Sequence, residues 1–339
     1  MPVNADNLNT LALYGISLKK ELKAASILQL NGYDDDIRMS KQLYDKLLFA
    51  IKNSVSNSIK LPQTTFGIEL EFVGSCYSKD INAFNNAMFK LLPDKYFCAL
   101  SYTHNDGNSW ILGRDGSIKL NNTAIKIPYG YELSSPKLNL FDDNDINTVA
   151  TVIEYCKTYL HAEINQSCGT HIHIGFKHDG LFRGSICDAL SAYSFMEKTV
   201  FDPIVPSSRR RNRYCKPTRP WPGNKYQKLS SRFCEFSWDG KCKTLHFEFR
   251  QLEGTLDINT IIYWANLQAY ILYDLLDHID NNSYIQTTMK KNIFELLFKY
   301  GFDSKLISFF IRRVIEFRSR TLIQIDDLNK GVFYTSTAS

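Results

Sequence analysis

The most constraining feature of the sequence is a short apolar segment that carries carboxylates at alternate positions. It runs from Phe66 to Phe72 and reads FGIELEF. Side chains alternate across a strand, so the aromatic and aliphatic residues share one face while Glu69 and Glu71 share the other. The rise of a strand separates these two carboxylates by about 7 Å. Such charges repel each other unless water, arginine or a cation lies between them.

The same pattern recurs in three further segments that we predict to be strands: THIHIG, LHFEFRQ and YGYELSSP. Their polar faces carry His171 and His173, then His246, Glu248 and Arg250, and lastly Glu132. Taken singly, each segment is more typical of an ordinary structural role than of a metal site: a buried, hydrogen-bonded histidine for His171, and a surface ion pair for Glu248 with Arg250. Together they differ from a solvated face, which normally mixes Thr, Lys, Ser and Gln. If the strands are neighbours, the groups converge on one concave surface that divalent cations would stabilise.

The ligand types indicate which cation this surface would bind. A carboxylate-rich set with one or two imidazoles favours Mg²⁺ or Mn²⁺ over zinc. The alternative is a zinc site at CGTHIH, with Cys168, His171 and His173 as ligands. It agrees less well with the sequence, because the aspartate of an HxHxDH hydrolase pattern is absent: Gly175 follows Ile174, and Phe176 and Lys177 come next.

A basic segment lies between these predicted strands. Residues 209–219 hold six cations beside two aromatic residues, namely Arg209, Arg210, Arg211, Arg213, Lys216 and Arg219 with Tyr214 and Trp221. The segment is compatible with a solvated loop or with a nucleic-acid-binding patch. Next to an acidic, cation-binding surface, a third interpretation fits better: guanidinium groups clamp polyphosphate oxygens and neutralise charge during phosphoryl transfer.

The overall composition describes an ordinary globular protein. The 339 residues are 44% hydrophobic and 22% charged, and the net charge is only +5. The eight cysteines form no CxxC pair, which favours free thiols in a reducing compartment. The N-terminal sequence lacks the features of a signal peptide, and no apolar run is long enough for a membrane span. We therefore expect a cytoplasmic protein.

The order of predicted elements indicates an α+β fold. Residues 1–60 appear helical, strands cluster between 64 and 136, and an amphipathic helix follows over 145–162 with Asp145 as its N-cap. Further helices are predicted over 184–201 and 256–279, and two more between 288 and 325. Because helices interrupt clusters of strands rather than alternating with them, we expect a mostly antiparallel sheet.

Five motifs, in order, resemble those of the amidoligase family, a divergent relative of glutamine synthetase and glutamate–cysteine ligase. They are FGIELEF, DGSI with GYELSSP, CGTHIHIG, SRRRNRYC and FEFRQLEGTLD, between Phe66 and Trp264. The resemblance implies a glutamine-synthetase-like curved sheet that binds ATP and Mg²⁺ (or Mn²⁺) on its inner face, with helices on the other side. It divides the chain into a helical N-terminal extension (1–60), a catalytic domain (61–282) and a helical C-terminal extension (283–339).

The resemblance also assigns metal ligands, namely Glu69, Glu71, Glu132, His171 and Glu248. The first two match the paired carboxylates that open the metal site of the superfamily, and His171 with Glu248 matches a shared second metal. One ligand is missing. Glutamine synthetases have another glutamate shortly before the position of Glu132, where this chain has Ala124 without a carboxylate nearby; Asp115 is a possible substitute.

The remaining assignments concern the nucleotide. Arg250 matches the arginine that faces the transferring phosphate, and Arg210 and Arg213 are similar to arginines of the basic loop near the phosphates. All three are therefore expected to be catalytic and to bind the nucleotide. We add His173 and Asp115 as further nucleotide-binding positions.

The function that the resemblance implies is ATP-dependent ligation of a carboxylate and an amine through an acyl phosphate. The substrates would be amino acids, peptides or peptide-bearing macromolecules. Three alternatives stay open on the sequence: a nucleic-acid-binding protein that uses residues 209–219, a metal-dependent hydrolase, and a catalytically inactive relative retained for binding. A nucleic-acid-binding protein would leave the acidic sheet face unexplained, so we expect neither nucleic acid nor membrane as a partner.

Overall fold

The computed structural model describes residues 61–92, 97–99, 109–121, 123–177, 193, 196–210, 215, 233–235, 244–280 and 293–318. They belong to two compact units. One contains the described residues between 61 and 177 and between 208 and 280, and the other contains those between 193 and 207 and between 293 and 318. The predicted helical extension at 1–60 lies outside the described residues. The predicted division into three domains stays a prediction.

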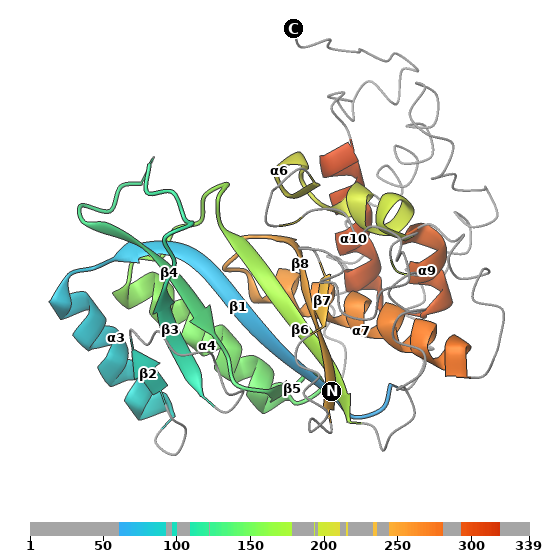
Figure 1. Cartoon of the computed structure of the whole chain (residues 1–339), viewed down its shortest axis with the longest axis horizontal. Coiled ribbons are helices and arrows are strands. Elements are labelled where there is room, and N and C mark those ends of the chain that lie inside the picture. Colours follow the sequence, from blue (N-terminus) through green and yellow to red (C-terminus); the bar gives the residue numbers. More distant parts are fainter. Residues whose placement is uncertain are drawn as a thin grey trace, which may run out of the picture. The chain divides into compact units, whose positions relative to one another are not determined.

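The first unit is built on an eight-stranded sheet (Figure 1). Its strands are β1 (Thr64–Ser75), β2 (Phe97–Ala99), β3 (Trp110–Arg114), β4 (Pro128–Ser134), β5 (Leu138–Asn139), β6 (Gly169–Lys177), β7 (Phe233–Glu235) and β8 (Thr244–Glu253). The order across the sheet is β2-β3-β4-β1-β6-β8-β7, with β5 paired to β1. All pairs are antiparallel except β2 with β3. The predicted α+β class with a mostly antiparallel sheet is confirmed.

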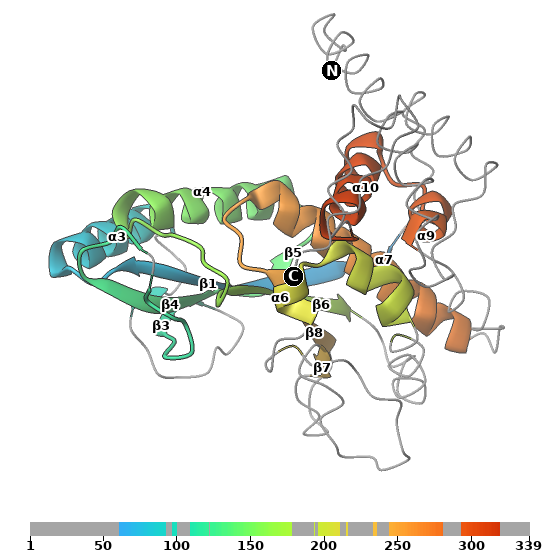
Figure 2. The same ribbon diagram turned by 90° about the horizontal axis from the view of Figure 1, so that it is seen from above.

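Helices cover the apolar face of this sheet. Figure 2 shows α3 (Ser78–Leu91), α4 (Asp143–Tyr159) and α7 (Ile258–Asp280) on one side of it. The alternate residues Phe66, Ile68, Leu70 and Phe72 of β1 point to that side and are at most 2% exposed. Full burial of each such side chain contributes roughly 1.5–3 kcal/mol. The face that carries Glu69 and Glu71 is therefore the one opposite α3, α4 and α7.

The helix predicted over 145–162 begins two residues earlier than expected. Asp142 is its N-cap, and its carboxylate accepts a hydrogen bond from the backbone N–H of Asn144. Asp145, which we expected as the cap, instead accepts a hydrogen bond from the backbone N–H of Asn139 at 2.8 Å. This contact joins the start of α4 to β5. Asp142 fits the cap better because its extended backbone is the usual N-cap conformation.

The second unit is helical in its described part. It contains η2 (Glu197–Phe201), η3 (Asp202–Ile204), α9 (Ile293–Lys299) and α10 (Ser304–Arg318), and the last two are the helices predicted between 288 and 325. Arg313 Nε donates a hydrogen bond to the carbonyl of Ile204 at 2.8 Å, which joins α10 to η3. Within the described ranges, no helix has the length and apolar character required to span a membrane.

Candidate metal centre

Strand register brings the ionisable faces of four strands together. The strands β4, β1, β6 and β8 are consecutive neighbours in the sheet. Their Cα partners pair Glu71 with Glu132, Glu69 with His171, and His173 with Glu248. Two carboxylates directly opposite each other on neighbouring strands destabilise a sheet unless something compensates their charge. The convergence predicted from the sequence is thus present in the register.

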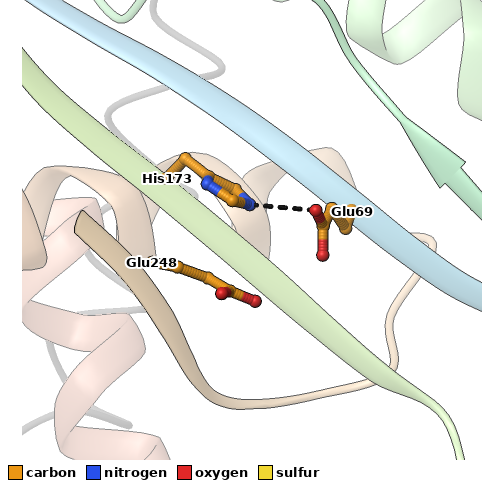
Figure 3. Close-up of side chains that lie close together, drawn as sticks. All are labelled: Glu69, His173 and Glu248. Carbon is orange, nitrogen blue, oxygen red and sulfur yellow. Dashed lines mark ion pairs between the residues drawn. The ribbon is translucent and has the colours of Figure 1, made fainter. Parts of the chain in front are cut away.

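Three groups of side chains on this face have a geometry that could hold cations. In each group the ligand atoms lie within 4.8 Å of one another: Glu69 with His173 and Glu248, Glu69 with Glu132 and His171, and Glu71 with Asp115 and Glu132. Figure 3 shows the first group, with side chains from three neighbouring strands turned toward one another. Glu69 belongs to two groups and so does Glu132, so the three groups form one continuous centre.

His171 lies in the middle of this centre and contacts three carboxylates. Its Nδ1 is 2.8 Å from Glu69 Oε2 and 3.2 Å from Glu248 Oε1, and its Nε2 is 3.3 Å from Glu71 Oε1. Burial alone would lower the pKa of His171, but the hydrogen bonds with Glu248 and Glu69 raise this pKa to about 10. In the metal-free protein the imidazole is therefore protonated at neutral pH and balances part of the carboxylate charge.

The four glutamates differ in how readily they ionise. Burial opposes ionisation of Glu69 and Glu248, but hydrogen bonds with His171 hold the pKa of both carboxyls below its usual range. Burial raises the pKa of Glu71. Burial, with repulsion from Glu69, raises the pKa of Glu132 to about 8. The metal-free centre thus contains one carboxyl that still holds its proton at neutral pH, as expected where a cation's charge is missing.

These shifts predict how the stability of the metal-free protein depends on pH. The folded pKa of Glu132, about 8, and that of His171, about 10, both exceed the ordinary values of 4.5 and 6.5. The folded protein therefore keeps protons that the unfolded chain has already released, and the free energy of unfolding falls as pH rises from about 5 to about 10. The low pKa values of Glu69 and Glu248 act with the opposite sign, and only at acid pH.

Scanning calorimetry in EDTA measures this dependence. We expect the Tm to fall by several degrees between pH 6 and pH 9, and Glu132→Gln to reduce the fall below about pH 8, since it removes one of the two groups. A Tm that rises over this range in EDTA would contradict the protonated state of His171.

Arg250 lies beside the centre, as the sequence predicted. Its Nε is 2.6 Å from Glu248 Oε1, and Glu248 is fully buried. Arg250 is only partly buried. Its guanidinium therefore pairs with a buried carboxylate and lies on the ionisable face of β8, the face that carries Glu248.

The basic segment contains a buried arginine that we did not single out from the sequence. Arg209, in the short helix α6 (Ser207–Arg210), is only 3% exposed, and its Nη2 donates a hydrogen bond to the backbone carbonyl of Arg250. Arg210, the residue we had predicted, is partly exposed, and Arg213 lies outside the described residues. One arginine among the five of residues 209–219 carries no signal of burial, so the sequence could not distinguish Arg209 from its neighbours.

Asp115 takes part in the third group, whereas the zinc alternative finds no support. Asp115 is close to Glu71 and Glu132, and it also accepts hydrogen bonds from the backbone N–H and the hydroxyl of Ser117. Ala124 is exposed. Cys168 belongs to none of the ligand groups found among the described residues, and it packs instead against Val73 and Ile118.

The fold and the centre together define a class of protein. A mostly antiparallel sheet presents clustered carboxylates, imidazoles and an arginine on the face opposite α3, α4 and α7, and this set of side chains could hold a cation. The chain belongs to the amidoligase family: the family model described as "Putative amidoligase enzyme" matches residues 62–232, half of the chain. Membership indicates an enzyme of the ligase kind. Glu248 and Arg250 lie beyond the matched range.

Comparison with solved structures gives only distant similarities. The chain is similar to glutamine synthetase from Plasmodium falciparum, at 14% identity and a TM-score of 0.31, over 73% of this chain and 57% of that one. It is also similar to a class II 3-hydroxy-3-methylglutaryl-CoA reductase from Streptococcus pneumoniae, at 10% identity and a TM-score of 0.17, over 84% of this chain and 71% of that one. These TM-scores are too low to establish a shared fold. No curated protein sequence matches the chain significantly.

Proposed function

We propose that this protein is an ATP-dependent carboxylate–amine ligase that forms an amide through an acyl phosphate. The observation that carries the proposal is the continuous centre. Glu69 links the first and second ligand groups, Glu132 links the second and third, and Arg250 pairs with Glu248 beside them. Family membership supports the ligase class. The substrates we propose are a carboxylate and an amine from amino acids, peptides or peptide-bearing macromolecules.

The donor set fits divalent cations of the Mg²⁺ or Mn²⁺ type. Most of the donors are carboxylate oxygens, which these cations prefer, and the imidazoles of His171 and His173 suit Mn²⁺ as well. The proton held by Glu132 and the charge on His171 are the features expected of such a set without its cations. Glu69, Glu71, Glu132, His171 and Glu248 would be the ligands, joined by His173 and Asp115.

The reaction must bring a carboxylate next to the γ-phosphate of ATP, and both are anions. Cations held by Glu69, Glu71, Glu132, His171 and Glu248 would supply Lewis-acid chemistry and neutralise part of this charge. The carboxylate oxygen attacks the γ-phosphorus and ADP leaves; the amine then attacks the acyl carbon and phosphate leaves. Arg250, together with Arg210 and Arg213, would stabilise charge on the transferring group. Exclusion of water would protect the acyl phosphate from hydrolysis.

ATP binding is expected to require a divalent cation. The carboxylate face repels a triphosphate when no cation is present, so we expect the affinity measured by titration calorimetry to fall by more than about tenfold when EDTA replaces Mg²⁺ or Mn²⁺. Equal affinity in EDTA would contradict the proposal. A salt-sensitive gel shift with an oligonucleotide in EDTA would instead favour nucleic-acid binding through residues 209–219.

A further inference from the structure

The pairing between β6 and β8 is irregular at one point, next to the candidate centre. Thr170 pairs with Leu252 and Ile172 pairs with Phe249, so His171 on β6 lies opposite two residues of β8, Arg250 and Gln251. One extra residue on a strand is a β-bulge, which bends the strand and redirects its side chains.

The bulge changes which face the following residues occupy. Gln251, 1% exposed, accepts a hydrogen bond from Nε2 of Gln268 on α7 at 3.3 Å, so it points to the helix-covered face. Leu252 is fully buried and pairs with Thr170, whose side chain is on that same face. Regular alternation would have placed only one of these two consecutive side chains there. The bulge therefore leaves Arg250 next to the centre while the chain after it packs into the core.

Arg209 spans the two strands at this bulge. Its guanidinium hydrogen-bonds the backbone carbonyl of Arg250 on β8, and it also lies against Gly169 on β6. A Cβ at Gly169 would be only 2.7 Å from Nη2 and 2.9 Å from Nη1 of Arg209. Gly169 shares the face of His171 and His173 by strand alternation, so the guanidinium lies on the ionisable face.

Gly169 also contacts the centre directly. Its backbone N–H donates a hydrogen bond to Glu71 Oε2 at 2.6 Å. A single glycine thus supports the guanidinium of Arg209 and holds a carboxylate of the centre. A larger residue at this position would displace one or the other, which gives Gly169 a packing role rather than a conformational one.

We propose that Arg209 is a positioning residue that holds the β8 bulge so that Arg250 faces the metal centre. The carbonyl of a bulged residue loses its regular ladder partner, and a buried carbonyl needs a replacement donor. The guanidinium can supply that donor while it packs against Gly169, whereas a lysine ammonium on a flexible stem cannot do both. The catalytic part of this inference rests on the proposed ligase function.

A double-mutant cycle tests whether Arg209 acts through Arg250. We expect Arg209→Gln to lower the kcat for ADP release by about 10-fold to 100-fold, while the KM for ATP changes by less than about threefold. In an Arg250→Lys background the same substitution should cost less than about threefold, because the residue that Arg209 positions is already impaired. An equal loss in both backgrounds would overturn the inference, since Arg209 would then act independently of Arg250.

Hydrogen exchange tests the bulge without reference to any reaction. Arg209→Gln and Gly169→Ala should both accelerate amide exchange in residues 249–252 and leave residues 149–156 of α4 unchanged. Gly116→Ala is the matched control, because a Cβ there meets nothing within 4 Å. Unchanged exchange in residues 249–252 would refute the positioning role. If wild-type protein releases no ADP with any substrate, the proposed function fails while this measurement still decides the inference.

Discussion

Replacing Glu248 with alanine is expected to reduce amide formation by about 10³-fold or more. Glu248 belongs to the group with Glu69 and His173, contacts His171, and anchors Arg250. Loss of one cation position removes several kcal/mol of transition-state stabilisation. About 4 kcal/mol corresponds to a factor of 10³. Turnover is measured as ADP release coupled to amide product.

The stability of the same variant separates two descriptions of the centre. If the carboxylates only repelled one another, removing one would leave the metal-free protein unchanged or slightly more stable. The structure predicts that the variant is less stable. Glu248 pairs with a protonated His171 and with Arg250, and both positively charged side chains would lose a buried partner. We therefore expect a lower Tm in EDTA for Glu248→Ala and a smaller decrease for Glu248→Gln, which keeps the volume of the side chain.

The matched control is Glu154→Ala on α4. Glu154 is exposed and forms a surface pair with Lys157 at 2.7 Å, which is worth at most about 1 kcal/mol. Wild-type turnover and an almost unchanged Tm are expected for this variant. If Glu248→Gln also retained wild-type turnover, Glu248 would have no part in catalysis and the assignment of the centre would be wrong.

Changing Arg250 to lysine is expected to lower kcat by roughly 10²–10³ while ATP affinity stays nearly constant. A loss of this size is typical of removing one preorganised stabiliser of developing charge. Ground-state ATP would already be held by cations and the basic segment, so one weaker contact matters little for binding. An interaction made mainly in the transition state lowers turnover rather than affinity.

The alternative is that Arg250 serves only as the ion-pair partner of Glu248. The 2.6 Å contact between Arg250 Nε and Glu248 shows that this pairing exists. A lysine could replace such a pair with its single ammonium, but it cannot pair with Glu248 and also present a planar fork to two phosphate oxygens. Steady-state kinetics, together with calorimetric ATP binding, distinguishes a catalytic role from a purely structural one. Wild-type turnover in Arg250→Lys would show that Arg250 serves only as the ion-pair partner of Glu248.

The sequence predicts which side chains share a face of each strand, because the alternation of side chains depends only on neighbouring residues. Alternation alone places Glu69 with Glu71 and His171 with His173, and the apolar partners of each pair are indeed buried. The choice of a mostly antiparallel sheet followed from clustered strands. Cation-binding groups could be anticipated because few other arrangements tolerate so many carboxylates on one face.

The rest of the centre depends on contacts between segments far apart in the sequence. Register decides that Glu132 lies opposite Glu71, and that His173 lies opposite Glu248. The bulge at Arg250 breaks the alternation on which the strand prediction relied. The protonated state of His171 depends on its hydrogen bonds with Glu248 and Glu69 and on the nearby charge of Glu71, which no local pattern reveals.

The central claim is that a carboxylate, rather than water, attacks ATP. The most direct measurement is ADP release with pooled carboxylates and pooled amines in ¹⁸O-enriched water. We predict ADP release that requires both pools and Mg²⁺ or Mn²⁺, with phosphate that carries no label from water, because its new oxygen comes from the carboxylate. Phosphate labelled from the solvent would identify a hydrolase. No ADP from any combination of pools, with Mg²⁺ or Mn²⁺ present, would contradict the proposed ligase.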